Sequence, residues 1–251
     1  MSYACVTTFG PAFYEKYGRE AVATMARYWP GPVIAYGEGA RPADLPERVE
    51  YRDLLLDAEC ANFIDWTGKC PFVQGRLPNG EYEYHYNMHK FGRKAFVISA
   101  MRRPFFFLGA DVHILKPIPE SFLAEMLEGK FGAFLFRPKP LHTESDFAGY
   151  NTNHPDWGRF AYAYRSIYTT GSVLMLLKES GGLHDCWSLD YLLEHTGLRA
   201  QCLDLVNGVR GDDPKGFHVW PKTRLAEYMV HLKGRIKKDP ARKAEALKGA
   251  A

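Results

Sequence analysis

The apolar run Phe105–Leu108, which is followed at once by Gly109-Ala110-Asp111, is the feature of this sequence that most restricts its fold. Four consecutive apolar residues are too few to cross a membrane, and their lack of alternation with polar residues indicates a strand covered on both faces. Ligands of open α/β sheets bind beyond the carboxyl ends of such strands. Asp111 is therefore a candidate site residue, although a strand-end aspartate that caps the helix expected from Pro119 would leave the same pattern.

The first forty residues predict a strand, a helix and a second strand. Tyr3–Thr8 is a short β-like run that ends at Gly10-Pro11. Over Phe13–Tyr28 apolar residues recur at steps of three and four, which is typical of one helical face, and Val33–Tyr36 is β-like again. This order predicts a parallel βαβ unit with a right-handed crossover, and we expect Phe105–Leu108 to lie beside or near both strands.

The rest of the chain predicts further alternation with one interruption. We expect the segment from Lys139 to Tyr168 to be irregular and functional, because it has no clean period and is rich in His, Asn, Asp and aromatic residues. Elsewhere we expect helices over Leu54–Trp66, Asn87–Met101, Pro119–Lys130 and Leu183–His195, and strands over Phe131–Phe136, Ser172–Leu177 and Ala200–Val206. Together these elements predict one α/β domain over residues 1–238, with a mainly parallel sheet flanked by helices, and a basic C-terminal tail over residues 239–251.

Composition and charge exclude several other classes. The 251 residues are 46% hydrophobic and 24% charged, which is enough to bury a full core. There is no basic leader and no apolar run near the roughly 18 residues of a membrane helix, so we expect a soluble protein of the cytoplasm. From His231 onward there are seven lysines and arginines and two acidic residues. This segment therefore has a net charge of +5, whereas the whole chain has +3. This basic end predicts an anionic ligand nearby, or simply a solvated tail.

Four separate stretches carry a family pattern. They are Val6–Phe9 at the end of the first strand, Lys94–Ile98 in a helix, Phe107–Asp111 at the end of the central strand, and His231–Arg235 near the C-terminus. Together they resemble the nucleotide-sugar-dependent glycosyltransferases of the GT-A fold, a Rossmann-like α/β fold. In that family an Asp-x-Asp motif ends the central strand, and a His-x-x-Gly or His-x-Lys-Gly signature closes over the donor diphosphate.

The resemblance implies a role for each matching residue. Asp111 and His231 would bind Mn²⁺ or Mg²⁺, which stabilises the negative charge of the departing diphosphate. Asp185 is the first candidate to contact the acceptor hydroxyl and Asp190 the second, although Asp185 could equally cap its own helix. The donor nucleotide sugar would contact Thr7, Thr8, Phe9, Lys94, Asp111, Thr170, Gly171, Lys233 and Gly234, with Thr170 and Gly171 in a turn that leads into a strand.

The chain departs from the family pattern at Gly109, which stands where the first aspartate of the motif is usual. Three interpretations follow: a cation held loosely by Asp111, His231 and the diphosphate, a metal-free enzyme that uses its basic tail, or a protein without activity. On the first interpretation we expect weak metal binding by the free protein and stronger binding when a nucleoside diphosphate adds its oxygens. We also expect Gly109→Asp to strengthen metal binding if the backbone accepts a side chain.

The sequence therefore predicts a glycosyltransferase that moves a sugar from a nucleotide-diphosphate sugar to an acceptor hydroxyl. The acceptor is left open among a glycan, a lipid-linked sugar, a small molecule and a modified nucleic acid, the last slightly favoured by the basic tail. The alternative is a non-catalytic nucleotide-sugar-like or nucleic-acid-binding protein that kept the fold. A nucleotidyltransferase is disfavoured because no glycine-rich phosphate loop follows the first strand.

Overall fold

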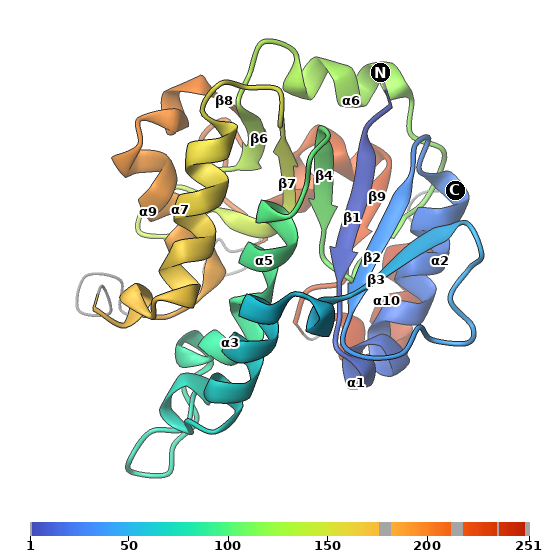
Figure 1. Cartoon of the computed structure of the whole chain (residues 1–251). Helices are drawn as coiled ribbons and strands as arrows, with labels where there is room; N and C mark the ends of the chain where they lie inside the picture. Colours follow the sequence, from blue (N-terminus) through green and yellow to red (C-terminus); the bar gives the residue numbers. More distant parts are fainter. Residues whose placement is uncertain (1, 176–181, 212–217, 235, 249–251) are drawn as a thin grey trace.

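The computed structural model describes residues 2–175, 182–211, 218–234 and 236–248, which form an α/β fold with helices on both faces of a mixed, mostly parallel sheet (Figure 1). This seven-stranded sheet has the order β3-β2-β1-β4-β7-β6-β8. Among the described residues of this sheet, only the pairs β4–β7 and β6–β7 are antiparallel. The strands are β1 Ala4–Thr8, β2 Val33–Gly37, β3 Val49–Asp53, β4 Phe105–Leu108, β6 Gly132–Leu135, β7 Glu144–Tyr150 and β8 Cys202–Asp204.

Helices pack on the two faces of this sheet. The residues of α3, α5, α7 and α9 share one core with the sheet, and those of α2 and α6 share the other. No helix in the described parts of the chain combines the length and the apolar content that spanning a bilayer requires. The helices are α1 Pro11–Phe13, α2 Arg19–Tyr28, α3 Ala58–Gly68, α4 Met88–Phe91, α5 Arg93–Ser99, α6 Glu120–Leu127, α7 Trp157–Thr169, α9 Asp185–His195 and α10 Pro240–Lys248, and a π-helical turn, Tyr14–Gly18, joins α1 to α2.

The central strand β4 is covered on both faces, as its uniform apolar sequence predicts. Phe105 and Phe107 belong to the core under α5 and α7, whereas Phe106 and Leu108 belong to the core under α2 and α6. This division follows from the strand's period of two. All four side chains are fully buried. The predicted neighbours are also confirmed, because β1 lies between β2 and β4 and is parallel to both.

Most of the segment from Lys139 to Tyr168 is regular, so the expectation of an irregular segment is wrong. It contains β7, which lies between β4 and β6, and the long helix α7. The strand begins with three polar residues because its first half lines the site described below. In α7 the buried residues do fall at helical spacing, but most of them are aromatic: Trp157, Phe160, Ala161, Tyr164, Ile167 and Tyr168.

The structure differs from the sequence prediction at two further places, one of them an element that was not predicted. The edge strand β3 was not expected, because only Val49 of its five residues is fully covered and the sequence shows no apolar run there. The strand expected over Ser172–Leu177 is instead a 3₁₀ turn over Ser172–Leu174, and residues 176 and 177 lie outside the described residues.

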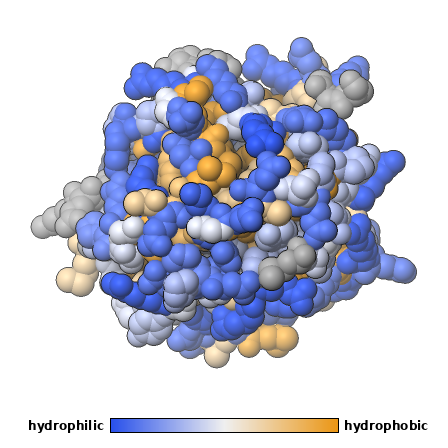
Figure 2. All heavy atoms as spheres, turned by 90° about the horizontal axis from the view of Figure 1, so that it is seen from above, coloured by the Kyte–Doolittle hydropathy of each residue, from blue (hydrophilic) through white to orange (hydrophobic). Residues whose placement is uncertain are grey.

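The chain turns back on itself near its end. Strand β9, Met229–His231, pairs antiparallel with β5, Val112–Ile114, in a second, two-stranded sheet. Helix α10 then lies near α2, where Lys243 forms an ion pair with Glu20 (Figure 1). The carboxyl ends of β1, β2 and β4 lie at the bottom of Figure 1. The opposite end, seen from above in Figure 2, is mostly hydrophilic, with a central group of hydrophobic residues and a few more at the rim.

Candidate functional site

The small sheet brings Asp111 and His231 together although 120 positions separate them. Asp111 lies in the turn between β4 and β5, and His231 ends β9, where it pairs with Val112. The N–H of Leu232 donates a hydrogen bond to the carbonyl of Asp111 at 3.1 Å. As a result His231 Nε2 lies 3.4 Å from Asp111 Oδ1, and both side chains are buried. The two residues that sequence analysis assigned to metal binding therefore share one site.

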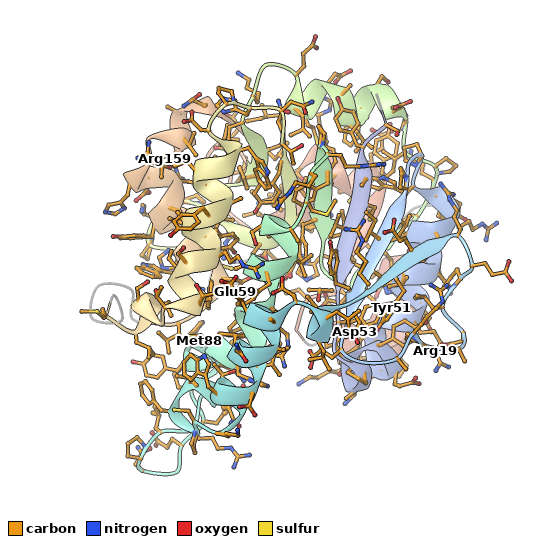
Figure 3. The ribbon with its side chains drawn as sticks, in the orientation of Figure 1. Arg19, Tyr51, Asp53, Glu59, Met88 and Arg159 are labelled. Carbon is orange, nitrogen blue, oxygen red and sulfur yellow. The ribbon has the colours of Figure 1, made fainter. Side chains whose placement is uncertain are left out.

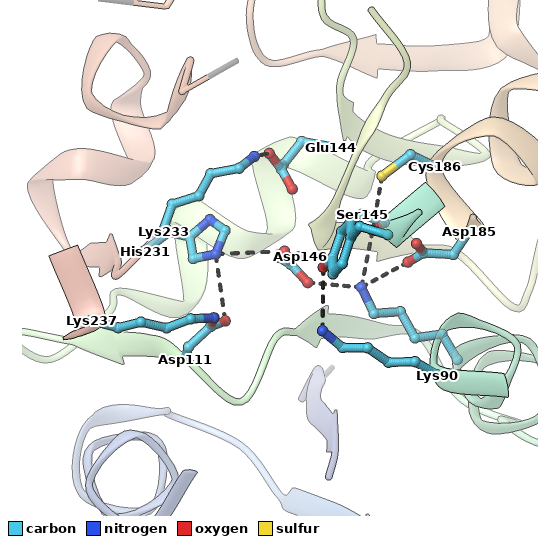
Figure 4. A network of polar contacts seen from close by, with 12 residues as sticks. Lys90, Asp111, Glu144, Ser145, Asp146, Asp185, Cys186, His231, Lys233 and Lys237 are labelled. Carbon is cyan, nitrogen blue, oxygen red and sulfur yellow. Dashed lines mark hydrogen bonds and ion pairs between the residues drawn. The ribbon is translucent and has the colours of Figure 1, made fainter. Parts of the chain in front are cut away.

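Asp146 is a third member of this site, and sequence analysis missed it. It lies on β7 opposite the end of β4, where the N–H of Gly109 donates to the carbonyl of Asp146 at 2.9 Å. Asp146 Oδ2 is 3.5 Å from His231 Nε2. One ligand atom from each of Asp111, Asp146 and His231 lies within 4.8 Å of the other two (Figure 4). The acidic run Glu144-Ser145-Asp146 was the available signal, hidden in a segment that showed no period.

Lys94 links this cluster to a further carboxylate. From α5 its Nζ lies 2.7 Å from Asp146 Oδ1 and 2.7 Å from Asp185 Oδ2, and it donates to Ser145 Oγ at 3.0 Å. The Lys94 side chain is only 14% exposed, so these oxygens replace most of its hydration. Lys94 therefore acts as the shared counterion of two carboxylates on different elements.

Two lysines from the end of the chain reach the same site. Lys237 Nζ lies 2.6 Å from Asp111 Oδ2 and 5.3 Å from the ring centroids of Phe13 and Tyr17. Lys233 forms an ion pair with Glu144. Each carboxylate of the cluster thus has a lysine on one oxygen, while Asp111 Oδ1 and Asp146 Oδ2 point to the common centre at His231 Nε2 (Figure 4).

In the cluster, each carboxylate favours the charged form of the neighbouring basic groups, and each basic group favours the charged form of the carboxylates. Burial opposes the charge on Asp111, but His231 and Lys237 outweigh it and lower the pKa of that carboxyl to about 2. At Asp146 burial is likewise outweighed, here by Lys94 and His231, and the pKa lies well below its usual range. Burial would lower the pKa of His231, but Asp111 and Asp146 raise it overall. The two carboxylates therefore favour the charged form of His231 in the free protein.

An aromatic pocket opens at the same edge of the sheet, beyond the ends of β1, β2 and β3. The rings of Phe9 and Tyr14 lie 4.7 Å apart, and Tyr51 of β3 is seen beside Asp53 in Figure 3. Arg93 holds the carboxylate of Glu38 with two nitrogens, at 2.5 and 3.2 Å. The pocket has a volume of about 150 Å³ and is lined by Phe9, Pro11, Tyr14, Glu15, Glu38, Ala40, Pro42 and Tyr51.

Thr7 and Thr8 end β1 directly before Phe9. Their hydroxyl oxygens are both buried, and neither has a hydrogen-bond partner among the described residues. Thr7, Thr8 and Phe9, which were predicted to contact the donor nucleotide sugar, thus lie at the edge of the sheet that carries Asp111.

The two candidate acceptor-side aspartates have different surroundings. Asp185 is not the cap of α9, because the N-cap is His184, whose Nδ1 accepts from the N–H of Trp187 at 3.3 Å. The side chain of Asp185 instead reaches Lys94 in the cluster. Asp190 lies apart from Lys94, with its oxygens bound by the N–H and hydroxyl of Thr143, by Arg199 and by His142.

Thr170 and Gly171 do not lie in a turn that leads into a strand, as had been expected. They end helix α7, where the Thr170 hydroxyl donates to the carbonyl of Ser166 at 2.7 Å. Among the described residues no hydrogen bond or ion pair joins either one to the cluster around Asp111. Gly234, by contrast, follows Lys233 directly and has a φ of +58°, a conformation that favours glycine.

Next to Asp185 lies a group of three histidines, and the pKa of His184 among them predicts a pH effect on stability. His184 lies between His85 and His142, with ring centroids 5.2 and 5.3 Å away. Burial lowers the pKa of His184 to about 4, and His142, His85 and Arg137 add to this against the opposing charge of Asp185. Between pH 6.5 and 4 the unfolded chain therefore takes up a proton at this position that the folded chain does not.

We expect the free energy of unfolding to fall by about 2–3 kcal/mol from this group as the pH drops from 6.5 to 4. His184→Asn keeps a side-chain acceptor at the helix N-cap but does not titrate, so it should lose less stability over the same pH range. Urea denaturation of both proteins at pH 7 and pH 4.5 measures the difference. Parallel losses in the two proteins would contradict a neutral, buried His184.

Comparisons with known proteins show a remote structural likeness. No protein-family model matches the sequence, and no curated protein matches it either. Mouse xyloside xylosyltransferase 1 in its apo form is 14% identical, with a TM-score of 0.47 over 78% of this chain and 83% of that one. The glycosyltransferase GlyE of Streptococcus pneumoniae TIGR4 is 10% identical, with a TM-score of 0.44 over 82% of this chain and 45% of that one. Likeness at this level does not carry function from one protein to another.

Proposed function

We propose that this protein is a nucleotide-sugar-dependent glycosyltransferase of the GT-A type, which transfers a sugar from a nucleotide-diphosphate donor to an acceptor hydroxyl. The observation that carries the proposal is the meeting of Asp111, Asp146 and His231 beside an aromatic pocket at the carboxyl edge of the sheet. Ligands of open α/β sheets bind at this edge. The four sequence stretches that resemble the family supply the expected order of parts.

The donor set fits a divalent cation of the kind that the family resemblance implies. Two carboxylate oxygens and one imidazole nitrogen suit Mn²⁺, and carboxylates suit Mg²⁺. Asp111, Asp146 and His231 would hold the ion, which when bound neutralises charge on the leaving diphosphate. Lys233 and Lys237, which pair with Glu144 and Asp111 at this site, would neutralise the diphosphate charge that remains.

In this proposal the pocket binds the base of the donor and the acidic cluster binds its diphosphate. A planar base would lie against Phe9, Tyr14 or Tyr51, and the carboxylate of Glu38 would accept hydrogen bonds from its N–H groups. On the other side of the cluster, Asp185 would contact the acceptor hydroxyl while Lys94 holds that carboxylate in position. The acceptor remains a glycan, a lipid-linked sugar, a small molecule or a modified nucleic acid. We propose that the protein acts in the cytoplasm.

A thermal-shift screen tests the proposal. At a concentration about a hundredfold above its dissociation constant, a nucleoside diphosphate or its sugar conjugate should raise the midpoint of unfolding by about 5–10 °C with Mn²⁺ present. The conjugate that gives the largest shift should then be hydrolysed slowly to free sugar in the same buffer. Inorganic phosphate at equal concentration is the control for simple anion binding.

Two results would contradict sugar transfer. The first is the lack of any shift with the common nucleoside diphosphates, which would remove the donor site. The second is tight binding with no hydrolysis and no transfer to any acceptor class, which would favour a non-catalytic protein that kept the fold.

A further inference from the structure

The space beside Gly109 is already filled by another residue. A Cβ atom added to Gly109 would stand 2.9 Å from Asp146 Oδ1, 3.0 Å from Asp146 Cβ and 3.1 Å from Asp111 Oδ1. Opposite Cβ atoms on antiparallel strands are ordinarily about 4.5–5.5 Å apart. The end of this strand pair therefore has room for one side chain, and Asp146 provides it.

The backbone at Gly109 is not the reason for the glycine. Gly109 is absent from the glycines with positive φ, so an ordinary residue could adopt its conformation. What excludes a side chain is the neighbouring strand: the N–H of Gly109 donates to the carbonyl of Asp146, and the preceding pair is Leu108 with Phe147. A side chain at 109 would emerge between the carboxylates of Asp111 and Asp146.

We infer that Asp146 is a metal-binding residue that supplies from β7 the carboxylate missing at position 109 of β4. This inference rests on the proposed function and explains why the second carboxylate of the ligand set comes from β7 and not from position 109. In the free protein the two oxygens of Asp146 have different partners. Oδ1 contacts Lys94, while Oδ2 faces the centre shared with Asp111 Oδ1 and His231 Nε2.

Neutralising Lys94 does not by itself account for Asp146. Lys94 has a second carboxylate at the same distance, because Asp185 Oδ2 also lies 2.7 Å from its Nζ. Asp146 Oδ2 also pairs with His231, and with Asp111 Oδ1 and His231 Nε2 it completes a set of three ligand atoms that lie within 4.8 Å of one another.

The experiment exchanges the two residues across the strands. Mn²⁺ binding is measured by calorimetry and by the spin-resonance signal of free Mn²⁺, first with Mn²⁺ alone and then with uridine or guanosine diphosphate added. The proteins are wild type, Asp146→Asn, Gly109→Asp and the exchange variant G109D/D146G. Asp65→Asn is the matched control, because it removes a carboxylate that is 65% exposed on α3.

Asp146→Asn should weaken Mn²⁺ binding by about tenfold or more, as expected for removal of one of few charged ligands. The Mn²⁺ affinity of the exchange variant should recover to within about threefold of wild type, because positions 109 and 146 together again carry one aspartate. Gly109→Asp alone should have a lower midpoint of unfolding, since two side chains would share room for one. Asp65→Asn should bind Mn²⁺ as wild type does.

Unchanged Mn²⁺ binding by a folded Asp146→Asn protein would overturn the inference, and so would an exchange variant that folds but does not recover. No Mn²⁺ binding by wild type under any of these conditions would also overturn it. Nucleoside diphosphate binding in the same titrations without metal, and donor hydrolysis, report separately on the proposed function. The inference can therefore be wrong while sugar transfer stands. Conversely, a wild-type protein that binds Mn²⁺ but no nucleotide would contradict the proposed function and leave the inference intact.

Discussion

Replacing Lys94 with methionine should lower the free energy of unfolding by about 3–5 kcal/mol, because removal of one partner leaves buried carboxylates without a counterion. Lys94 lies 2.7 Å from both Asp146 and Asp185, and its own pKa is raised because these two carboxylates outweigh the effect of burial. Methionine keeps most of the side-chain volume, so the loss reports on charge more than on packing. Urea denaturation at pH 7 measures it.

Two further proteins make this result specific. Lys69→Met removes a lysine whose ion pair with Asp65 is largely exposed, and it should change stability by less than about 1 kcal/mol. The double variant Lys94→Met/Asp185→Asn removes one of the stranded charges and should recover part of the loss. If Lys94→Met were as stable as Lys69→Met, the buried ion network would not contribute to the fold as the contacts indicate.

In the unmodified protein Mn²⁺ should raise the affinity for a nucleoside diphosphate by about tenfold to a hundredfold, and the diphosphate should raise the affinity for Mn²⁺ by the same factor. The free protein should bind Mn²⁺ weakly, since lysines already neutralise one oxygen of Asp111 and one of Asp146. Asp111→Asn should reduce this factor to about one, because it removes a charged ligand on which the coupling depends. Calorimetric titration of each ligand with and without the other gives the factor directly.

Asp65→Asn is again the control, and it should keep the full coupling. Equal diphosphate affinity with and without Mn²⁺ in the unmodified protein would rule out the metal-assisted mechanism. It would favour a donor site in which His231, Lys233 and Lys237 supply the positive charge alone, or a protein that binds nucleotides without catalysis.

The regular parts of the fold could be predicted from the sequence because their signals are local. The uniform apolar run of β4 indicates cover on both faces, and the steps of three and four in Phe13–Tyr28 indicate one buried helical face. Where local signals are mixed, the same reasoning failed. The strand β7 starts with polar residues because it lines a site, and the buried residues of α7, although they fall at helical spacing, are mostly aromatic and were not recognised as one helical face.

The site was only half visible in the sequence, for a physical reason. Asp111 and His231 could be named because each stands in a short motif, and the pairing of β5 with β9 places them 3.4 Å apart. Asp146 belongs to no such motif. It enters the cluster because β7 is the antiparallel neighbour of β4 and because Gly109 leaves space for one side chain between them. The sequence by itself determined which charged groups are present and where the central strand ends, whereas strand pairing, a long-range property of the tertiary structure, decided which of them share a centre.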